Sequence, residues 1–243
     1  MAADEALLDA AVRSDMATLR FYRWREPTLS LGYFQPIAQR TDHPPSREMA
    51  VVRRLSGGGA LVHDHELTYS LALPASQPLT QNHKNLYTLV HQALINTLRD
   101  LGIHARMQHD DSVNSTSPAE APFLCFQRHG PGDVLMSGSG GQPVKILGSA
   151  QRRRRGALLQ HGSLLLATSR SAPELPGLDE LIHRKPGHSK RLGCAKLMEL
   201  WHLYIKENLG LDLLPSHWSP RQLDCIQRYQ QAKYCCPSWT EAR

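Results

Sequence analysis

Three consecutive glycines, Gly57–Gly59, interrupt the chain between two short apolar segments. The segments 50–55 and 60–63 are rich in Val, Leu and Ala and predict strands. Three glycines between two strands can form a hairpin turn, although one or two glycines are enough for such a turn. Glycine also lets the backbone approach a ligand closely and point its amides at it. Because Arg53 and Arg54 precede this loop, we expect it to contact an anionic or carbonyl-bearing ligand.

The glycine loop does not match the common nucleotide-binding patterns. The chain has no G-x-x-x-x-G-K-[ST] run at this place. The pattern G-x-G-x-x-G fails because Val62 stands where the last glycine should be. The sequence therefore disfavours a kinase-like or dinucleotide-binding site.

Strand-like segments fill the first two thirds of the chain, and helical segments stand at its start, middle and end. Residue type predicts strands at 18–23, 28–34, 67–73, 133–136, 144–149 and, as one strand or a pair, 156–166. Helical spacing of apolar residues predicts helices at 2–13, 85–101, 193–208 and 218–231. Composition predicts loops at 108–122 and 167–190. Because strands and helices do not alternate regularly, the expected fold class is α+β, a mixed β-sheet with packed helices.

Length and cysteine usage favour a single cytoplasmic domain. The chain has 243 residues, and a domain commonly holds roughly 100–200. We expect one domain over 1–243, with a helical part from about residue 190. No stretch approaches the ~20 apolar residues of a membrane span, and the start lacks the features of a secretory signal. The five cysteines are odd in number and include the adjacent pair Cys235 and Cys236, which favours a reducing compartment.

Basic residues outnumber acidic ones, 28 to 22, which gives a formal charge of +6. This balance favours acidic partners, whether nucleic acid, an anionic membrane or an acidic protein. Nucleic acid has no further support, because zinc-ligand spacing, an aromatic RNA-binding pattern and a long basic helix are all lacking. His63 and His65 share one strand face, but without a third ligand we expect no metal site. The run Arg152–Arg155 is either a solvated turn or a docking patch.

Two further segments carry chemistry-bearing residues with more than one interpretation. Lys145 leads an apolar run toward Gly148, where a lysine usually extends from a strand end and small residues permit close packing. His161 is either a core histidine or part of a site. Cys125 stands between aromatic residues, as small buried cysteines often do. It becomes a nucleophile where a cation lowers its pKa, and Lys145 is a possible cation.

Taken together, these segments resemble the lipoate–protein ligase, octanoyltransferase and biotin ligase superfamily. The motifs that carry the resemblance occur in one order: Leu29–Gln35, Arg53–Asp64, Glu66–Ser70, Cys125–Phe126, Lys145–Gln151 and Leu159–Ser163. The resemblance covers about residues 2–240. Among the branches, the chain is most similar to the cysteine-dependent octanoyl-[glycine cleavage H protein] N-octanoyltransferases.

The resemblance implies a catalytic domain like that of biotin ligases and class II aminoacyl-tRNA synthetases, with helices packed on one side of the sheet. It also implies a narrow tunnel for an acyl chain, in which Cys125 accepts the acyl group and Lys145 contacts its carbonyl. The residues that would line this tunnel come from the glycine loop and two strands: Arg54, Ser56, Gly57, Gly58, Gly59, His63, Gly148, Ser149, Ala150, His161 and Gly162.

The implied activity moves an octanoyl or lipoyl group from a carrier-protein thioester, through Cys125, to a protein lysine. The donor would be octanoyl-acyl carrier protein. The acceptor would be a lipoyl-domain protein such as glycine cleavage H protein or a dehydrogenase E2 subunit. No cofactor, nucleic acid or membrane is implied.

One alternative is an ATP-dependent lipoate–protein ligase, which would use ATP and Mg²⁺ and for which Cys125 would be incidental. The segment Glu66–Ser70, where ligases tend to carry an asparagine, favours the transferase. A second alternative is a non-catalytic binding protein that kept the fold, against which Lys145 and Cys125 argue.

The chain departs from the family pattern at two places. It begins inside the first family motif, so we expect the strand that precedes this motif to be missing and a sheet edge to be exposed. The segment Ser137–Gln142 is an insertion rich in glycine, which we expect to form a mobile loop.

Overall fold

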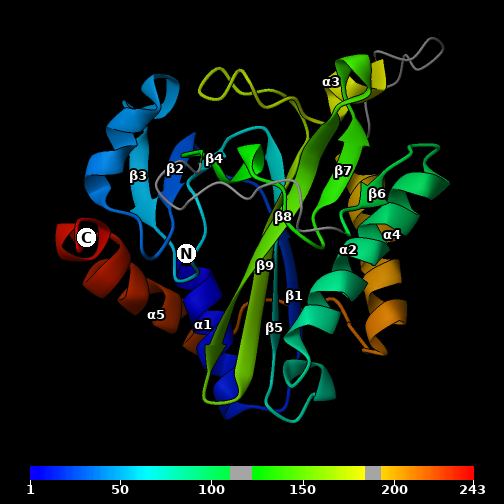
Figure 1. The fold of residues 1–243 in the computed structure, drawn as a ribbon. Helices are drawn as coiled ribbons and strands as arrows, with labels where there is room; N and C mark the ends of the chain where they lie inside the picture. The colour runs from blue at the N-terminus through cyan, green and yellow to red at the C-terminus, as the bar shows by residue number, and fades with distance from the viewer. Residues whose placement is uncertain (110–121, 184–192) are drawn as a thin grey trace.

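Two β-sheets form the centre of the computed structural model, which describes residues 1–109, 122–183 and 193–243 (Figure 1). The larger sheet has six strands in the order β1-β5-β9-β8-β7-β6, and every neighbouring pair is antiparallel. Its strands are β1 (Thr18–Tyr22), β5 (Glu66–Leu73), β9 (Ala157–Leu165), β8 (Pro143–Arg154), β7 (Val134–Ser137) and β6 (Arg106–Met107). The smaller sheet has the order β3-β2-β4, with β3 at Ala50–Arg53, β2 at Thr28–Leu31 and β4 at Leu61–His63. Because β2 runs parallel to β3 and antiparallel to β4, the predicted mixed α+β class is confirmed.

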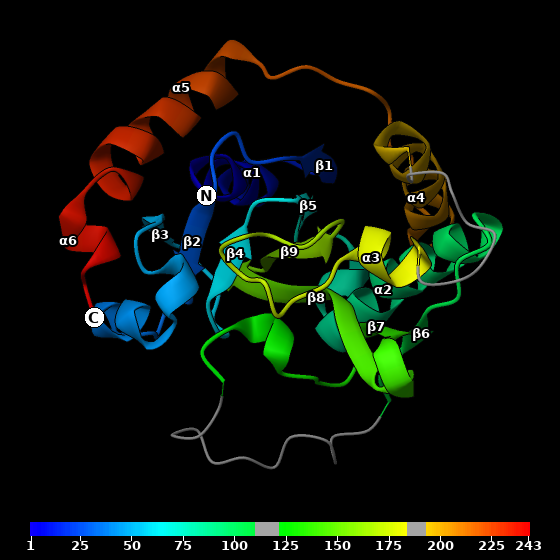
Figure 2. The same cartoon turned by 90° about the horizontal axis from the view of Figure 1, so that it is seen from above.

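Helices cover both faces of the larger sheet, so the expectation of helices on one side was wrong (Figure 2). On one face lie α2 (His83–Asp100) and α4 (Cys194–Leu209). On the other lies α1 (Ala2–Arg13), and α5 (Pro220–Tyr229) packs outside it. Short helices complete the fold, with α3 at Leu178–His183 and α6 at Pro237–Thr240. None of the helices that the structure describes is long and apolar enough to cross a membrane.

Alternation along β5 separates an apolar face from a polar one. Its odd-numbered residues, Leu67, Tyr69, Leu71 and Leu73, belong to the core under α2 and α4. The even-numbered Glu66, Thr68 and Ser70 face the opposite side, because successive strand residues point to opposite faces. The largest core cluster therefore lies on one side of the sheet, and the polar residues of β5 face the other side, where a smaller apolar cluster packs under α1.

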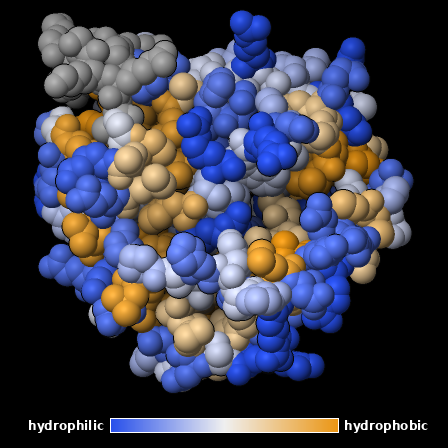
Figure 3. All heavy atoms as spheres, turned by 180° about the vertical axis from the view of Figure 1, so that it is seen from behind, coloured by the Kyte–Doolittle hydropathy of each residue, from blue (hydrophilic) through white to orange (hydrophobic). Residues whose placement is uncertain are grey.

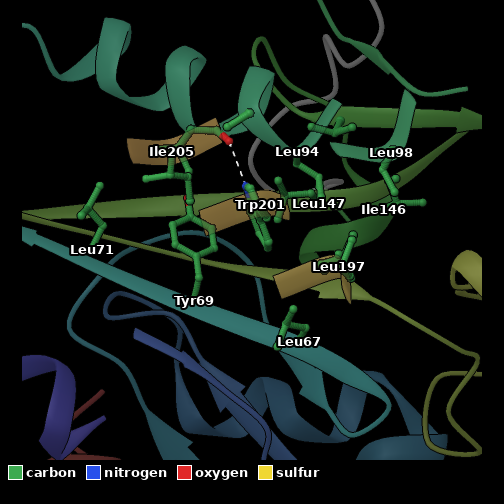
Figure 4. Close-up of a cluster of buried hydrophobic side chains, with 14 of the residues drawn as sticks. Leu67, Tyr69, Leu71, Leu94, Leu98, Ile146, Leu147, Leu197, Trp201 and Ile205 are labelled. Carbon is green, nitrogen blue, oxygen red and sulfur yellow. Dashed lines mark hydrogen bonds between the residues drawn. The ribbon is translucent and has the colours of Figure 1, made fainter. Parts of the chain in front are cut away.

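Trp201 of α4 is at the centre of this core (Figure 4). It is fully buried, its ring packs against Tyr69 and Phe21, and its Nε1 donates to the Val90 carbonyl of α2 at 3.3 Å. The face seen from behind Figure 1 is mostly hydrophilic, with separate hydrophobic patches (Figure 3). The apolar contacts that hold α2 and α4 on the sheet are thus concentrated at Trp201.

A network of charged groups connects α1 to β8 and to the C-terminal segment. Glu5 accepts from Arg154 at 2.6 Å, from Lys233 at 2.8 Å and from the Tyr234 hydroxyl at 2.8 Å. Arg154 also pairs with Asp9. Burial raises the pKa of Glu5, but these hydrogen bonds outweigh it, and the pKa is lowered from its ordinary 4.5.

Several boundaries differ from those expected from the sequence. The run Arg152–Arg155 is not a free turn, because β8 extends to Arg154 and its guanidinium is used in the network with α1. The segment 156–166 forms one strand and not a pair. The segment 167–190 contains α3, although 184–190 lie outside the described residues. Most of the predicted loop 108–122 also lies outside them, and mobility of Ser137–Gln142, where a short 3-10 turn forms, stays a prediction.

Replacing Trp201 should test how far the core depends on it. We expect Trp201→Ala to lower the free energy of unfolding by about 3–5 kcal/mol, because it removes a buried ring and leaves a cavity. Chemical denaturation followed by circular dichroism measures this. Leu203→Ala, on the same helix but 51% exposed, is the control and should change stability by less than about 0.5 kcal/mol. Equal losses of unfolding free energy in the two variants would contradict the central role of Trp201 in the core.

Replacing Glu5 should alter how stability depends on pH. A lowered carboxyl pKa stabilises the fold fully above the ordinary value of 4.5 and loses that effect as pH falls through the lowered value. We expect Glu5→Gln to cost about 2 kcal/mol or more at pH 7, and the difference from the parent chain should shrink in acid. Asp224→Asn is the control, because its carboxylate is largely exposed. A cost that did not depend on pH would contradict this account.

Candidate active site

A pocket lies on the polar side of the larger sheet, where the smaller sheet meets it. It encloses about 520 Å³ including the solvent in its open mouth. Most of the residues that the sequence singled out line it: Arg54, Gly57, Gly58, His63, Cys125, Gly148, Ser149, Ala150, His161 and Gly162. Ser56, Gly59 and Lys145 lie behind this lining and contact it.

The glycine loop positions Cys125. Ala60 donates its amide to the Phe123 carbonyl at 2.9 Å, and Cys125 donates its amide to the Ala60 carbonyl at 2.8 Å. A Cβ at Gly59 would lie only 3.0 Å from the Phe123 carbonyl oxygen and 3.1 Å from the Cys125 nitrogen. Gly59 therefore serves to bring the cysteine segment against the loop, and it does not itself line the pocket.

Lys145 places a buried ammonium group beside the Cys125 thiol. Its Nζ lies 3.9 Å from Sγ of Cys125, 2.8 Å from Oδ2 of Asp133 and 3.2 Å from the Arg128 carbonyl. Burial lowers the pKa of Lys145, but the neighbouring Cys125 and Asp133 outweigh it and the pKa is raised. Lys145 is thus held as a cation next to the sulfur.

Gly148 provides the space that the Lys145 side chain occupies. A Cβ at this position would lie 2.5 Å from Cε and 2.9 Å from Nζ of Lys145. A side chain of any size at residue 148 would displace the amine from the thiol. This contact explains a glycine here better than strand packing alone.

Asp133 and Tyr87, which the sequence analysis missed, hold the lysine in place. The Tyr87 hydroxyl of α2 donates to Oδ1 of Asp133 at 3.0 Å, and the Gly130 amide donates to Oδ2 at 2.8 Å. The Ser149 amide in turn donates to the Tyr87 hydroxyl at 3.1 Å. The predicted strands 133–136 and 144–149 placed Asp133 near Lys145, but no motif distinguished it from other loop acids.

Arg53 and Arg54 shape the loop through backbone carbonyls. Arg53 donates to carbonyls that include Gly32 at 2.9 Å and Thr240 at 2.8 Å, and it is not among the residues that line the pocket. Arg54 donates to the carbonyls of Gly57 at 2.9 Å and Gly59 at 2.6 Å, and it reaches the pocket wall. Burial lowers the pKa of Arg54 to about 10.

His161 is fixed at both ring nitrogens. Its Nδ1 lies 2.9 Å from Oδ2 of Asp4 in α1, and its Nε2 lies 2.6 Å from the Ser56 hydroxyl. Burial raises the pKa of Asp4, but the bonds from His161 and Ser70 outweigh it and the pKa is lowered. Ser56 thus orients a pocket residue. Asp4 joins the site, and its place in the first family motif was the signal that could have identified it.

His63 offers the pocket a ring nitrogen that no described residue bonds. Its Nδ1 lies 2.5 Å from Oε1 of Glu66, and its ring stacks on Trp24 with centroids 4.2 Å apart. Its buried Nε2 has no partner among the described residues, and the same holds for the Tyr22 hydroxyl and for Nε of Arg54. All of these atoms belong to pocket-lining residues, so the pocket keeps polar groups for a ligand or for water.

Ser149 and Gly162 contribute backbone and not side chains to the pocket. The Ser149 hydroxyl is turned to the α2 side, where it bonds the Tyr69 hydroxyl at 2.6 Å and Nε2 of His91 at 2.6 Å. A Cβ on Gly162 would lie 2.2 Å from this hydroxyl oxygen.

Among the residues that the structure describes, no group of three or more side chains could hold a metal ion.

The sequence profile of the Lipoyl protein ligase A/B catalytic domain matches residues 1–180, which is more than half of the chain. The chain belongs to this family. The matched part contains every pocket-lining residue, and α4 to α6 follow it. Family membership agrees with the motifs from which the sequence predicted it.

Curated relatives include octanoyltransferases named LipM. The one from Staphylococcus epidermidis is 35% identical, over 98% of this chain and 92% of its own length. The one from Lysinibacillus sphaericus is 28% identical, also over 98% of this chain and 92% of its own length.

Solved structures with the same fold are lipoate–protein ligases. Lipoate-protein ligase A bound with ATP superposes with a TM-score of 0.70 at 22% identity, covering 99% of this chain and 92% of that one. A chain from the lipoylation system of Thermoplasma acidophilum gives 0.70 at 20% identity, covering 99% and 89%. At these identities the similarity establishes the fold, and the lipoyl-ligase fold predicted from the motifs is confirmed.

Removing the Lys145 charge should make the Cys125 thiol less reactive. A cation beside a sulfur stabilises the thiolate, which is the form that iodoacetamide alkylates, so Lys145→Gln should slow alkylation at neutral pH at least about tenfold. Mass spectrometry of the Cys125 peptide measures the rate, and the other cysteine peptides serve as internal references. Lys196→Gln, on the exposed side of α4, should leave the rate unchanged. An unchanged alkylation rate in Lys145→Gln would contradict the effect of the Lys145 charge on the Cys125 thiol.

Proposed function

We propose that this chain is an octanoyltransferase of lipoate biosynthesis that works through an acyl-enzyme at Cys125. The observation that carries the proposal is the pairing of a pocket-lining thiol with a buried cation, Sγ to Nζ 3.9 Å. Relatives that align over nearly the whole chain and are named octanoyltransferase LipM support it.

In the first step, the Cys125 thiolate attacks the carbonyl carbon of an octanoyl thioester. A new carbon–sulfur bond forms, the bond to the carrier sulfur breaks, and the carrier leaves as a thiol after taking up a proton. Lys145 stabilises the thiolate and the negative charge that develops on the carbonyl oxygen. Because one thioester replaces another, the step requires neither ATP nor a metal ion.

In the second step, the amine of a protein lysine attacks the acyl-enzyme. An amide bond forms as the carbon–sulfur bond to Cys125 breaks, the sulfur leaves as a thiolate beside Lys145, and the proton lost by the amine is released to solvent. A lipoyl domain is the expected acceptor, and the T. acidophilum system is described together with its E2 lipoyl domain. The location we propose is the cytoplasm, which the odd number of cysteines favours.

Four pocket-lining residues form a row across the strands of the larger sheet. Cross-strand pairing aligns Gly148, Ser163, Thr68 and Tyr22 on one face, a row of three strand spacings or about 14 Å. An eight-carbon chain with bonds of about 1.5 Å is roughly 9 Å long, so the row is long enough for such a chain to lie alongside it. Burial of each CH₂ contributes about 0.8 kcal/mol.

Incubation with octanoyl-acyl carrier protein in the absence of ATP tests the proposal. We expect one octanoyl group on Cys125 by intact mass and peptide mapping, and its transfer to a lipoyl domain added afterwards. Cys125→Ala should abolish both, while Cys236→Ala should change neither.

Two results would overturn the transferase. Octanoylation of the acceptor by Cys125→Ala at the parent rate would exclude the acyl-enzyme. Activity only with free lipoate and ATP would establish the ATP-dependent ligase, whose fold this chain shares.

A further inference from the structure

Arginines without acidic partners gather around one side of the glycine loop. Arg53 and Arg54 are buried and donate to backbone carbonyls and the Ser30 hydroxyl, and neither forms an ion pair with a described residue. Arg152 and Arg243 also form none, and each stacks its guanidinium on Tyr33, at 5.3 and 4.5 Å from the ring centroid. No acidic side chain among the described residues therefore neutralises the positive charge of these guanidinium groups.

An exposed aromatic ring lies at the same place. Phe34 is 69% exposed, packs edge-on against Tyr33 with centroids 4.9 Å apart, and lies 5.3 Å from the Arg243 guanidinium. A ring that projects to this extent contributes little to the core. Exposed aromatic residues and arginines are the types enriched where proteins bind one another.

This surface borders the pocket. A Cβ on Gly57, which lines the pocket, would lie 3.7 Å from the Phe34 ring. Ala150 also lines it, and Arg152 follows two residues later on the same face of β8, about 6.6 Å further along. A partner seated here would therefore stand next to the pocket mouth.

We propose that Tyr33, Phe34, Arg152 and Arg243, together the rim, are the docking surface for the acidic protein that delivers the acyl thioester. The proposal rests on the proposed function. Charge complementarity selects this occupant, because the unpaired guanidinium groups favour carboxylates and the chain as a whole carries +6. The adjacent aromatic rings would supply the apolar contact at the centre of such an interface.

The rim replaces the docking patch expected from the run Arg152–Arg155. Arg154 is occupied by Glu5 and Asp9, and Arg153 donates to the Thr80 carbonyl. Arg155 is exposed at the β8–β9 turn, and its guanidinium lies over none of the aromatic rings that the structure describes. Only Arg152 of the run stands at the rim.

Rates of Cys125 acylation from three donors test the docking surface. The donors are octanoyl-acyl carrier protein, octanoyl-coenzyme A and octanoyl-N-acetylcysteamine, of which the last has neither protein nor phosphate. We expect Arg152→Glu and Phe34→Ala to lower kcat/KM at least about tenfold with the carrier protein and to leave the two small donors within about twofold. Arg155→Glu, which makes the same charge change at the turn, should keep the parent rate with every donor.

The other outcomes overturn the proposal. An equal loss with coenzyme A but not with N-acetylcysteamine would assign the rim to the phosphate of the arm. An equal loss with all donors would mean that the variants disturb the pocket. A loss of kcat/KM in Arg155→Glu as large as in Arg152→Glu would mean that the effect comes from net charge and not from the rim. If the parent chain accepts octanoyl from none of the donors, the proposed function fails instead.

Discussion

The burial of the Lys145 ammonium is the constraint on which the rest of the site depends. A buried charge is costly unless it is paired and hydrogen-bonded, and Lys145 is only 5% exposed. Asp133 supplies the counter-charge, Tyr87 fixes that carboxylate, and Gly148 leaves the space through which the amine passes. The sulfur of Cys125 then meets a cation whose position is fixed by residues from three separate elements.

Much of the fold could be predicted because apolar residues recur along each helix and strand with the period of that element. The helix at 85–101 and the strand at 67–73 were found nearly at their true bounds. The docking patch expected at Arg152–Arg155 could not be judged from the local sequence. The acids that pair with Arg154 are Glu5 and Asp9, which are far away in the sequence. Local patterns indicate that a residue is charged, but only the packed chain determines its partner.

In the site, too, motifs identified individual residues, but only the structure shows how they are arranged. Cys125, Lys145 and His161 were recognised from ordered motifs, and the structure brings them to one pocket. The direction in which each side chain points could not be predicted, because it depends on strand register and on the irregular pairing of β7 with β8. The Ser149 hydroxyl, for example, turns to the core and not to the pocket. Acids without a motif, such as Asp133, were recognised only in the structure.

The hydrogen bonds of Arg53 have a consequence for the choice of an expression boundary. Its guanidinium donates to the Thr240 carbonyl, and its own carbonyl accepts from Nε1 of Trp239. Both partners lie well beyond residue 180, where the family profile ends. A fragment cut at that boundary would retain every pocket residue and still lose the support of the glycine loop. The unit that the family profile covers is thus smaller than the unit that has to be produced intact.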